Sequence, residues 1–184
     1  MAGRPIVQNR LRYTLAQAVL RVLYGRRWHY ISPWQHGSVG AEGLFFHNGK
    51  LLLGRRAAWL EHPHKLSLVG GHLNFEDKEH VGEALAREAA EEAGLSLNAA
   101  DFPLERAFRA TLTHGKTYRE LHDVSTIVFH FVHELTDSQA SAVRPCPEMT
   151  HWALYDRSEV ERLIAAGEIA SDTEIIQEAF RARR

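Results

Sequence analysis

The sequence predicts a mixed α/β domain, because segments with strand periodicity alternate with segments of helical periodicity along most of the chain. The clearest strand signal is a hairpin, in which apolar runs over 39–46 and 51–55 flank the turn sequence His47-Asn48-Gly49-Lys50. The clearest helix signal extends from about 78 to 93. Gly94 follows it and suits a left-handed C-cap.

The other expected elements fill the rest of the α/β pattern. A short strand over 66–69 leads into the double glycine Gly70-Gly71. Two apolar segments further along the chain, over 106–113 and 124–133, are expected to be strands joined by the polar stretch 114–123. A strand over 152–154 and helices over 159–166 and 173–183 complete the pattern.

The N-terminal region has its own amphipathic pattern. Leu11, Leu15, Ala18, Val19 and Val22 recur at helical spacing and predict a helix over 9–24. We therefore expect a helical extension over 1–34 and one domain over 35–184 that includes the C-terminal helices. The extension is expected to pack on the domain or to form a homodimer interface. Its basic flanks leave contact with a membrane surface as an alternative.

Composition excludes several classes of protein. A chain of 184 residues can bury one core, and a net charge of −1 argues against a nucleic-acid partner. The single Cys146 excludes an internal disulfide, and the 12 histidines include no H-E-x-x-H pair for zinc. No apolar run approaches the ~20 residues of a membrane span, and the N-terminus lacks secretory features. We expect a cytoplasmic protein without a transmembrane segment.

Three carboxylates gather at the end of the predicted 78–93 helix. Glu88 and Glu92 lie four residues apart on one face, with Glu91 beside them. Like charges at this spacing repel one another, so their grouping does not favour the helix itself. Mg²⁺ prefers oxygen ligands and commonly bridges protein carboxylates to substrate phosphates. The pattern therefore predicts a metal-dependent site for phosphate chemistry.

The run Arg-Glu-Ala-Ala-Glu-Glu-Ala-Gly-Leu over 87–95 resembles the second half of the Nudix hydrolase box. The double glycine before the helix and the Glu-Met-Thr-His-Trp segment over 148–152 extend the resemblance, which covers about 38–180. It implies an α/β/α sandwich with a mixed β-sheet. It also implies hydrolysis of a pyrophosphate bond in a nucleoside diphosphate that is linked to another moiety.

The resemblance also implies roles for individual residues. Mg²⁺, with Mn²⁺ as the alternative, would be held by Glu88, Glu91 and Glu92 and by the backbone carbonyl of Gly70. These three acids and Arg87 form the predicted catalytic group.

The general base is left open by the box, because members of the family differ. Outside the box, Glu120 and Glu148 are candidates, and Asp123 is a weaker one.

The first acid of the box is ambiguous. Counting back from Arg87 selects Glu79, whereas counting forward from Gly71 selects Asp77. A two-residue insertion in the loop before the helix accounts for the difference. Helical spacing selects a third acid, because Glu83 alone lies one turn before Arg87. The ion-pair partner of Arg87 therefore stays open among the three acids. Elsewhere, a valine precedes the double glycine where many members have proline.

Four further residues are expected to bind substrate. Arg55 and Arg56 end the hairpin strand, where the family often places basic residues that contact phosphate, and guanidinium groups bind phosphate oxygens in pairs. His72 follows the glycines directly, and Glu148 is the fourth residue. The alternative for the arginines is a solvated strand end, and for His72 an exposed or structural histidine.

Two features indicate different substrates. Gly167-Glu168-Ile169 followed by Ser171-Asp172 resembles the end of ADP-ribose and nucleotide-sugar pyrophosphatases. Gly70-Gly71-His72-Leu73 and the small size resemble the MutT-like group, which acts on nucleoside triphosphates. We expect ADP-ribose or a nucleotide sugar first and a nucleoside triphosphate as the alternative. A catalytically silent module that senses nucleotides is the alternative of another class.

Overall fold

The structure, a computed structural model, describes residues 18–19, 22, 37–74, 77–117 and 122–183. The chain forms two units, Met1–Gly37 and Ser38–Arg184. In the first unit the described residues Ala18, Val19 and Val22 are helical. The remainder of the predicted 9–24 helix lies outside the described residues, and the boundary predicted at 34/35 stays a prediction.

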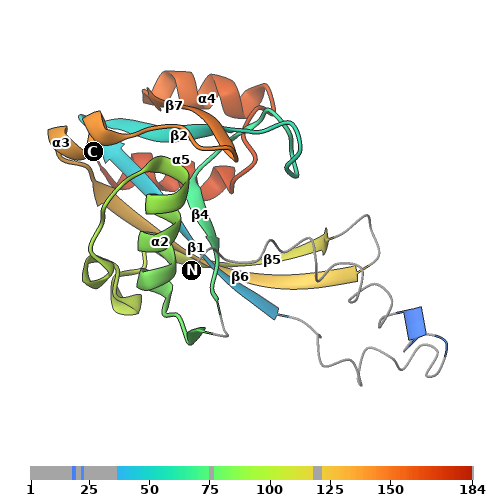
Figure 1. Ribbon diagram of the computed structural model, residues 1–184. Coiled ribbons are helices and arrows are strands. Elements are labelled where there is room, and N and C mark those ends of the chain that lie inside the picture. Colours follow the sequence, from blue (N-terminus) through green and yellow to red (C-terminus); the bar gives the residue numbers. More distant parts are fainter. Residues whose placement is uncertain (1–17, 20–21, 23–36, 75–76, 118–121, 184) are drawn as a thin grey trace. The chain divides into compact units, whose positions relative to one another are not determined.

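The second unit is built on a seven-stranded sheet (Figure 1). The strands follow the order β3-β2-β1-β6-β5, while β4 pairs with β1 and β7 pairs with β2. The strands are β1 (Gly37–His47), β2 (Lys50–Arg56), β3 (Leu66–Ser67), β4 (Val69–His72), β5 (Arg109–Thr117), β6 (His122–Glu134) and β7 (Met149–Tyr155).

Strand β1 has different neighbours along its length. Its residues 40–43 pair antiparallel with β4, and its last residues pair with β2 across the predicted turn, where Asn48 and Gly49 both have positive φ. On the other side, Ser38 Oγ lies 2.5 Å from Thr126 Oγ1, and the Leu135 N–H donates to the Phe46 carbonyl at 2.7 Å. These contacts show that β6 runs in the same direction as β1, so the sheet is mixed.

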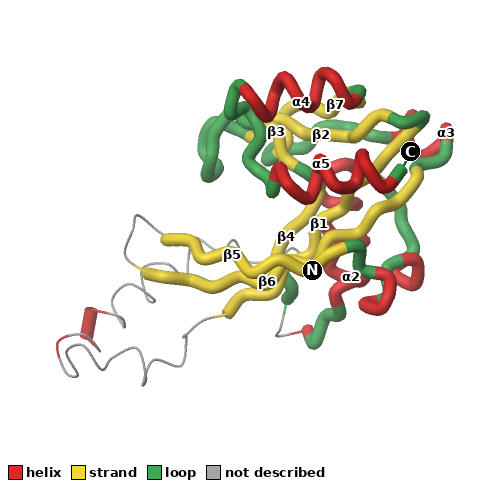
Figure 2. The backbone as a smooth tube through the Cα atoms, turned by 180° about the vertical axis from the view of Figure 1, so that it is seen from behind, coloured by secondary structure: helices red, strands yellow, loops and turns green. Residues whose placement is uncertain are grey.

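Helices cover both faces of this sheet (Figure 2). On β1, Ala41 and Phe45 belong to a core on the α2 side, whereas Leu44 and Phe46 belong to a core on the α4–α5 side. The predicted α/β/α sandwich is therefore confirmed. The helices are α2 (Val81–Ala93), α3 (Asp137–Ala142), α4 (Arg157–Ala165) and α5 (Thr173–Ala182). In the described part of the chain, no helix is long and apolar enough to span a membrane.

The start of α2 differs from the sequence expectation. The helix begins at Val81, because Lys78 has φ 56° and the chain turns before helical geometry is established. The Glu83 carboxylate accepts the His80 N–H at 2.8 Å and satisfies a backbone donor at the helix start. At the other end Gly94 adopts φ 67°, as its C-cap position predicted.

The β5–β6 hairpin is longer at its tip than predicted. A short 3-10 turn over Leu104–Arg106 delays β5 to Arg109, and the two strands then extend into the expected polar connection. Helix α3 was not predicted. It has only six residues, and its signal is a capping box in which Thr136 and Gln139 bond one another's backbone N–H groups.

Candidate active site

The candidate site lies where α2 packs against the double glycine of β4. A Cβ on Gly71 would lie 2.2 Å from Glu88 Oε1, and one on Gly70 would lie 2.3 Å from the Ala41 carbonyl oxygen. Only glycine allows the backbone to come this close to the helix and to β1. The Gly70 N–H donates to Glu92 Oε2 at 3.1 Å, so strand and helix are joined at the acids themselves.

Glu92 is the most buried acid of the site, with 8% of its surface exposed. Its backbone carbonyl accepts the Trp152 indole N–H at 3.0 Å, which fixes the end of α2 to β7. Burial raises the pKa of Glu92 to about 8. The Gly70 N–H opposes this shift, while the charges of Glu88 and Glu148 add to it. The carboxylate is therefore poorly compensated in its charged form.

Glu88 shares this environment. Burial raises its pKa, the ion pair with Arg87 opposes the shift, and the negative charges of Glu91 and Glu148 reinforce it. Glu148 is exposed and immediately precedes β7, and its backbone carbonyl accepts the Ala57 N–H at 2.8 Å. The fold thus brings this acid from a distant part of the sequence into electrostatic reach of Glu88 and Glu92.

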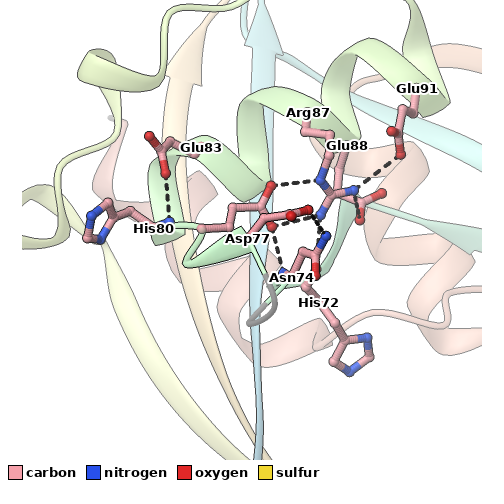
Figure 3. A network of polar contacts seen from close by, with 9 residues as sticks. His72, Asn74, Asp77, His80, Glu83, Arg87, Glu88 and Glu91 are labelled. Carbon is pink, nitrogen blue, oxygen red and sulfur yellow. Dashed lines mark hydrogen bonds and ion pairs between the residues drawn. The ribbon is translucent and has the colours of Figure 1, made fainter. Parts of the chain in front are cut away.

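Arg87 is the centre of the polar network in Figure 3. Its Nε lies 2.7 Å from Glu79 Oε1, and its Nη2 lies 3.1 Å from Glu79 Oε2. Its Nη1 donates to Glu88 Oε1 at 2.7 Å and to Glu91 Oε2 at 3.2 Å. Nη2 also donates to the His72 carbonyl at 3.0 Å. One guanidinium therefore connects the loop, the end of β4 and two of the predicted ligands.

The partner of Arg87 that the sequence left open is Glu79. The other two candidates have different partners: Asp77 accepts the Asn74 side-chain amide, and Glu83 caps the start of α2 through His80. Counting back from Arg87 selected the acid that occupies the position.

The acids fit a divalent cation by their chemistry. Glu88 and Glu92 supply oxygen ligands. The pKa of each is raised, and a bound cation would lower it again. Their side chains do not converge on one point with a third ligand. Among the described residues, no three His, Cys, Asp or Glu side chains form a metal-binding group. Glu91 is mostly exposed and is held by Arg87.

The two predicted arginines separate in the fold. Arg56 lies close enough to Glu92 for its charge to oppose the burial that raises the pKa of that acid. It also donates from Nε to the Glu61 carbonyl at 2.7 Å. Arg55 instead donates from Nη1 to the His64 carbonyl at 2.7 Å, and both bonds hold the loop after β2. Arg56 is thus the arginine within electrostatic reach of Glu92.

Three further residues were predicted from the sequence to bind substrate or to act as the base. The His72 side chain is exposed and points away from α2, while its carbonyl binds Arg87 (Figure 3). Glu120 lies outside the described residues, and of Asp123 only the backbone in β6 is described.

The segment over 167–172 has a structural task. The Glu168 carbonyl accepts the Leu66 N–H at 2.8 Å, and Ser171 Oγ accepts the Leu68 N–H at 3.0 Å. Asp172 caps the start of α5. The segment thus supports β3 and the residues that lead to the double glycine.

Sequence reasoning missed Glu42, which lies opposite Gly70 in the β1–β4 register. The Glu42 Cγ lies 2.9 Å from the position that a Cβ on Gly70 would occupy. The available signal was an acid inside an otherwise apolar and glycine-containing strand.

Comparison with known families agrees with this geometry. A model of the NUDIX domain matches residues 34–176, which is most of the chain. The chain belongs to the Nudix hydrolase family. The double glycine and the acids of α2 lie within the matched region. No curated protein sequence matches this Nudix chain.

Solved structures show the same fold at low sequence identity. A bifunctional NMN adenylyltransferase/ADP ribose pyrophosphatase from Francisella tularensis, complexed with AMP and a manganese ion, has a TM-score of 0.60 and 16% identity. The match covers 94% of this chain and 48% of that protein, so the chain spans about half of its length. A MutT protein from Methanosarcina mazei Go1 has a TM-score of 0.56 and 19% identity, with 83% and 98% covered.

A third structure, a Nudix hydrolase from Nitrosomonas europaea, has a TM-score of 0.58 and 17% identity. The match covers 80% of this chain and 91% of that one. At these identities the three similarities establish the α/β fold.

Proposed function

We propose that this Nudix hydrolase uses Mg²⁺, with Mn²⁺ as the alternative, to hydrolyse the pyrophosphate bond of ADP-ribose or a nucleotide sugar. The observation that supports metal dependence is the burial of Glu88 and Glu92 against the double glycine, which raises the pKa of both acids. The substrate class is supported by the structural similarity to the bifunctional NMN adenylyltransferase/ADP ribose pyrophosphatase from Francisella tularensis.

The ion would be held by Glu88, Glu91, Glu92 and the Gly70 carbonyl. A bound divalent cation neutralises phosphate charge and lowers the pKa of coordinated water. Arg87 positions the site, because it bonds Glu88 and Glu91 while its other donors bond Glu79 and the His72 carbonyl.

The residues around the acids bind the substrate and activate the attacking water. Arg56 supplies a guanidinium for phosphate oxygens beside Glu92. Glu148 is exposed and electrostatically coupled to Glu88 and Glu92, which makes it the described candidate for the base that accepts a proton from water. Arg55 and His72 are expected to make weaker substrate contacts from the edge of the site.

A nucleoside triphosphate is the second candidate substrate. The structural match to the Methanosarcina MutT protein covers 98% of that protein, so a chain of MutT size accounts for most of this domain. A silent nucleotide-sensing module is the alternative of another class, and it would bind nucleotide without consuming it.

A hydrolysis panel tests these alternatives. Wild type, Glu92→Gln and the control Glu105→Gln, which changes an exposed acid outside the site, are assayed with and without Mg²⁺ on ADP-ribose, nucleotide sugars and nucleoside triphosphates. We expect turnover of the sugar-linked diphosphates by wild type and control, and at least a hundredfold loss in Glu92→Gln. Preferential turnover of triphosphates would select the MutT-like function. Nucleotide binding without any turnover would select the sensor.

The remaining expectations concern the setting of the protein. We propose a cytoplasmic location, a nucleotide-derived small molecule as the partner rather than nucleic acid, and a homodimer. Light scattering at working concentration tests the last of these, and a monomeric mass would exclude it.

A further inference from the structure

One buried histidine lies outside the machinery described above. His130 on β6 is 1% exposed, and its Nε2 lies 2.9 Å from the Thr111 hydroxyl oxygen on β5. Its Nδ1 is fully buried, and no described residue meets it in hydrogen-bond geometry. With Thr111 as donor, Nε2 is the acceptor, and the proton of the neutral ring lies on Nδ1. An unpaired buried donor of this kind is costly unless it serves another group.

The group that Nδ1 faces is Glu42. Its Oε2 lies 3.4 Å from Nδ1, and about a quarter of the Glu42 side chain is exposed (26%). One carboxylate oxygen therefore lies close to the buried ring nitrogen without forming a hydrogen bond, and the side chain retains access to solvent. A carboxylate with one oxygen against the protein in this way can present its remaining acceptor positions to a ligand.

Glu42 also neighbours the double glycine, on the face of the sheet opposite to α2, because Ala41 next to it belongs to the core on the α2 side. It is paired with Gly70 in the β1–β4 register, and its Cγ contacts the position where a Gly70 side chain would start. Glu92 binds the N–H of the same glycine. Glu42 and Glu92 thus flank one residue, with Glu92 coming from α2 and Glu42 from β1.

A carboxylate at this position favours ligands that offer a hydrogen-bond donor. It repels the phosphates, so it is not suited to hold the pyrophosphate itself. It is suited to accept a hydrogen bond from a hydroxyl of a sugar attached to the pyrophosphate, and charge-assisted bonds of this type are strong. Carboxylate acceptors commonly serve for sugar hydroxyls because such a bond rejects ligands that lack the hydroxyl.

We propose that Glu42, held in place by His130, binds a sugar hydroxyl of the substrate and so determines which pyrophosphates this enzyme prefers. The inference rests on the proposed function for the choice of a sugar-linked diphosphate. Glu42 touches the ligand, whereas His130 and Thr111 act through Glu42 as positioning residues.

The test compares three ligands that share one pyrophosphate. They are ADP-ribose, the propyl ester of ADP, which lacks the terminal ribose, and ADP-ribose built on 2′,3′-dideoxyadenosine, which lacks the nucleoside hydroxyls. Affinities are measured by titration calorimetry with Ca²⁺ in place of Mg²⁺, and KM and kcat are measured with Mg²⁺. Wild type is expected to bind the ligand that lacks the contacted hydroxyl about 10–100-fold more weakly than ADP-ribose.

Variants of Glu42 should remove this preference. In Glu42→Ala the affinity ratio should fall towards one, and KM for ADP-ribose should rise more than kcat falls. Glu42→Gln keeps a neutral acceptor and should restore part of the ratio. Glu105→Gln, on the exposed turn before β5, is the matched control and should keep the wild-type ratio. An equal loss for all three ligands, or an unchanged ratio in Glu42→Ala, overturns the proposal.

The positioning role is tested through His130 and Thr111. His130→Gln and the milder Thr111→Val should lower the same ratio, and neither should change it further in the Glu42→Ala background. If each lowers it independently of Glu42, the positioning role is wrong. A wild-type protein that shows the binding preference but no turnover would refute the proposed hydrolysis and leave the assignment of Glu42 intact.

Discussion

Arg87 binds Glu79 through both carboxylate oxygens, with Nε 2.7 Å from Oε1 and Nη2 3.1 Å from Oε2. The two residues are eight positions apart, and Glu79 precedes the first residue of α2. The pair therefore fastens the loop before the helix onto the helix. Because Nη1 of the same guanidinium bonds Glu88 and Glu91, the position of the loop and the position of two predicted ligands depend on one side chain.

Glu79→Gln is expected to destabilise the protein by about 1–3 kcal/mol, because it weakens a paired, charge-assisted contact. Burial opposes the shift, but the bonds from Arg87 and from the Asn74 N–H lower the pKa of Glu79 overall. A lowered folded-state pKa contributes stability above the ordinary value of 4.5, which is lost as the pH falls through the lowered value. Urea unfolding at pH 7 and pH 3 should therefore show a smaller difference between variant and wild type at pH 3.

Glu83 supplies the control for this pair. Glu83→Gln affects the helix cap at His80, so its effect should add to that of Arg87→Gln. The Glu79→Gln and Arg87→Gln changes should instead show a coupling energy of about 0.5–3 kcal/mol in a double-mutant cycle. Stronger coupling of Arg87 to Glu83 than to Glu79 would contradict the assignment.

Removing the buried charge of Glu92 should stabilise the metal-free protein. Its folded-state pKa of about 8 lies above the ordinary 4.5, so the folded state binds the proton more tightly. The associated stability is fully present below pH 4.5 and is lost as the pH rises through about 8. Glu92→Gln keeps an acceptor for the Gly70 N–H without the charge. We expect it to raise Tm in EDTA by several degrees at pH 9 and very little at pH 5.

The same two proteins test metal binding when Mg²⁺ replaces EDTA. Wild type at pH 9 should gain stability with the ion, because the ion binds only the folded state, and Glu92→Gln should gain much less. If the variant is no more stable than wild type in EDTA at pH 9, burial of the charged Glu92 carboxylate does not destabilise the folded protein.

Local patterns in the sequence predicted most of the fold. The Asn48-Gly49 turn, the α2 acids and the Gly94 cap depend on neighbours within a few residues, and all three are present. The partner of Arg87 could not be settled in the same way. Helical spacing favoured Glu83, but the helix begins only at Val81 and uses Glu83 for its own cap.

Contacts between distant segments were beyond the sequence. The Trp152 indole meets the Glu92 carbonyl across 60 positions, and nothing in either local pattern indicates it. The pair of Glu42 and His130 depends on the register of β1 with β6, two strands that are far apart in the sequence. Periodicity predicts which residues share a face of a strand, but strand order determines which of them meet.

Gly71→Ala should disable the site with little change in the rest of the fold. The added methyl would lie 2.2 Å from Glu88 Oε1, so this carboxylate must move away from the double glycine. We expect at least a tenfold fall in kcat/KM with Mg²⁺. Gly49→Ala is the control, because Gly49 has φ 77° in the hairpin turn and open space around it. It should cost about 1 kcal/mol of stability and leave kcat/KM unchanged. Wild-type kcat/KM in Gly71→Ala would show that the close approach has no catalytic importance.

Arg56 and Arg55 are adjacent in sequence and are expected to differ in function. Arg56→Gln removes a cation within electrostatic reach of Glu92 and should lower kcat/KM on the preferred substrate about 10–100-fold, mainly through KM. Arg55→Gln removes a comparable bond to the same loop, since each arginine donates to one loop carbonyl at 2.7 Å. It should therefore cost similar stability but change kcat/KM less than threefold. Steady-state kinetics of both variants, together with their unfolding midpoints, separate support of the loop from binding of phosphate. Equal kinetic losses in the two variants would mean that the loop, and not the Arg56 charge, accounts for the effect.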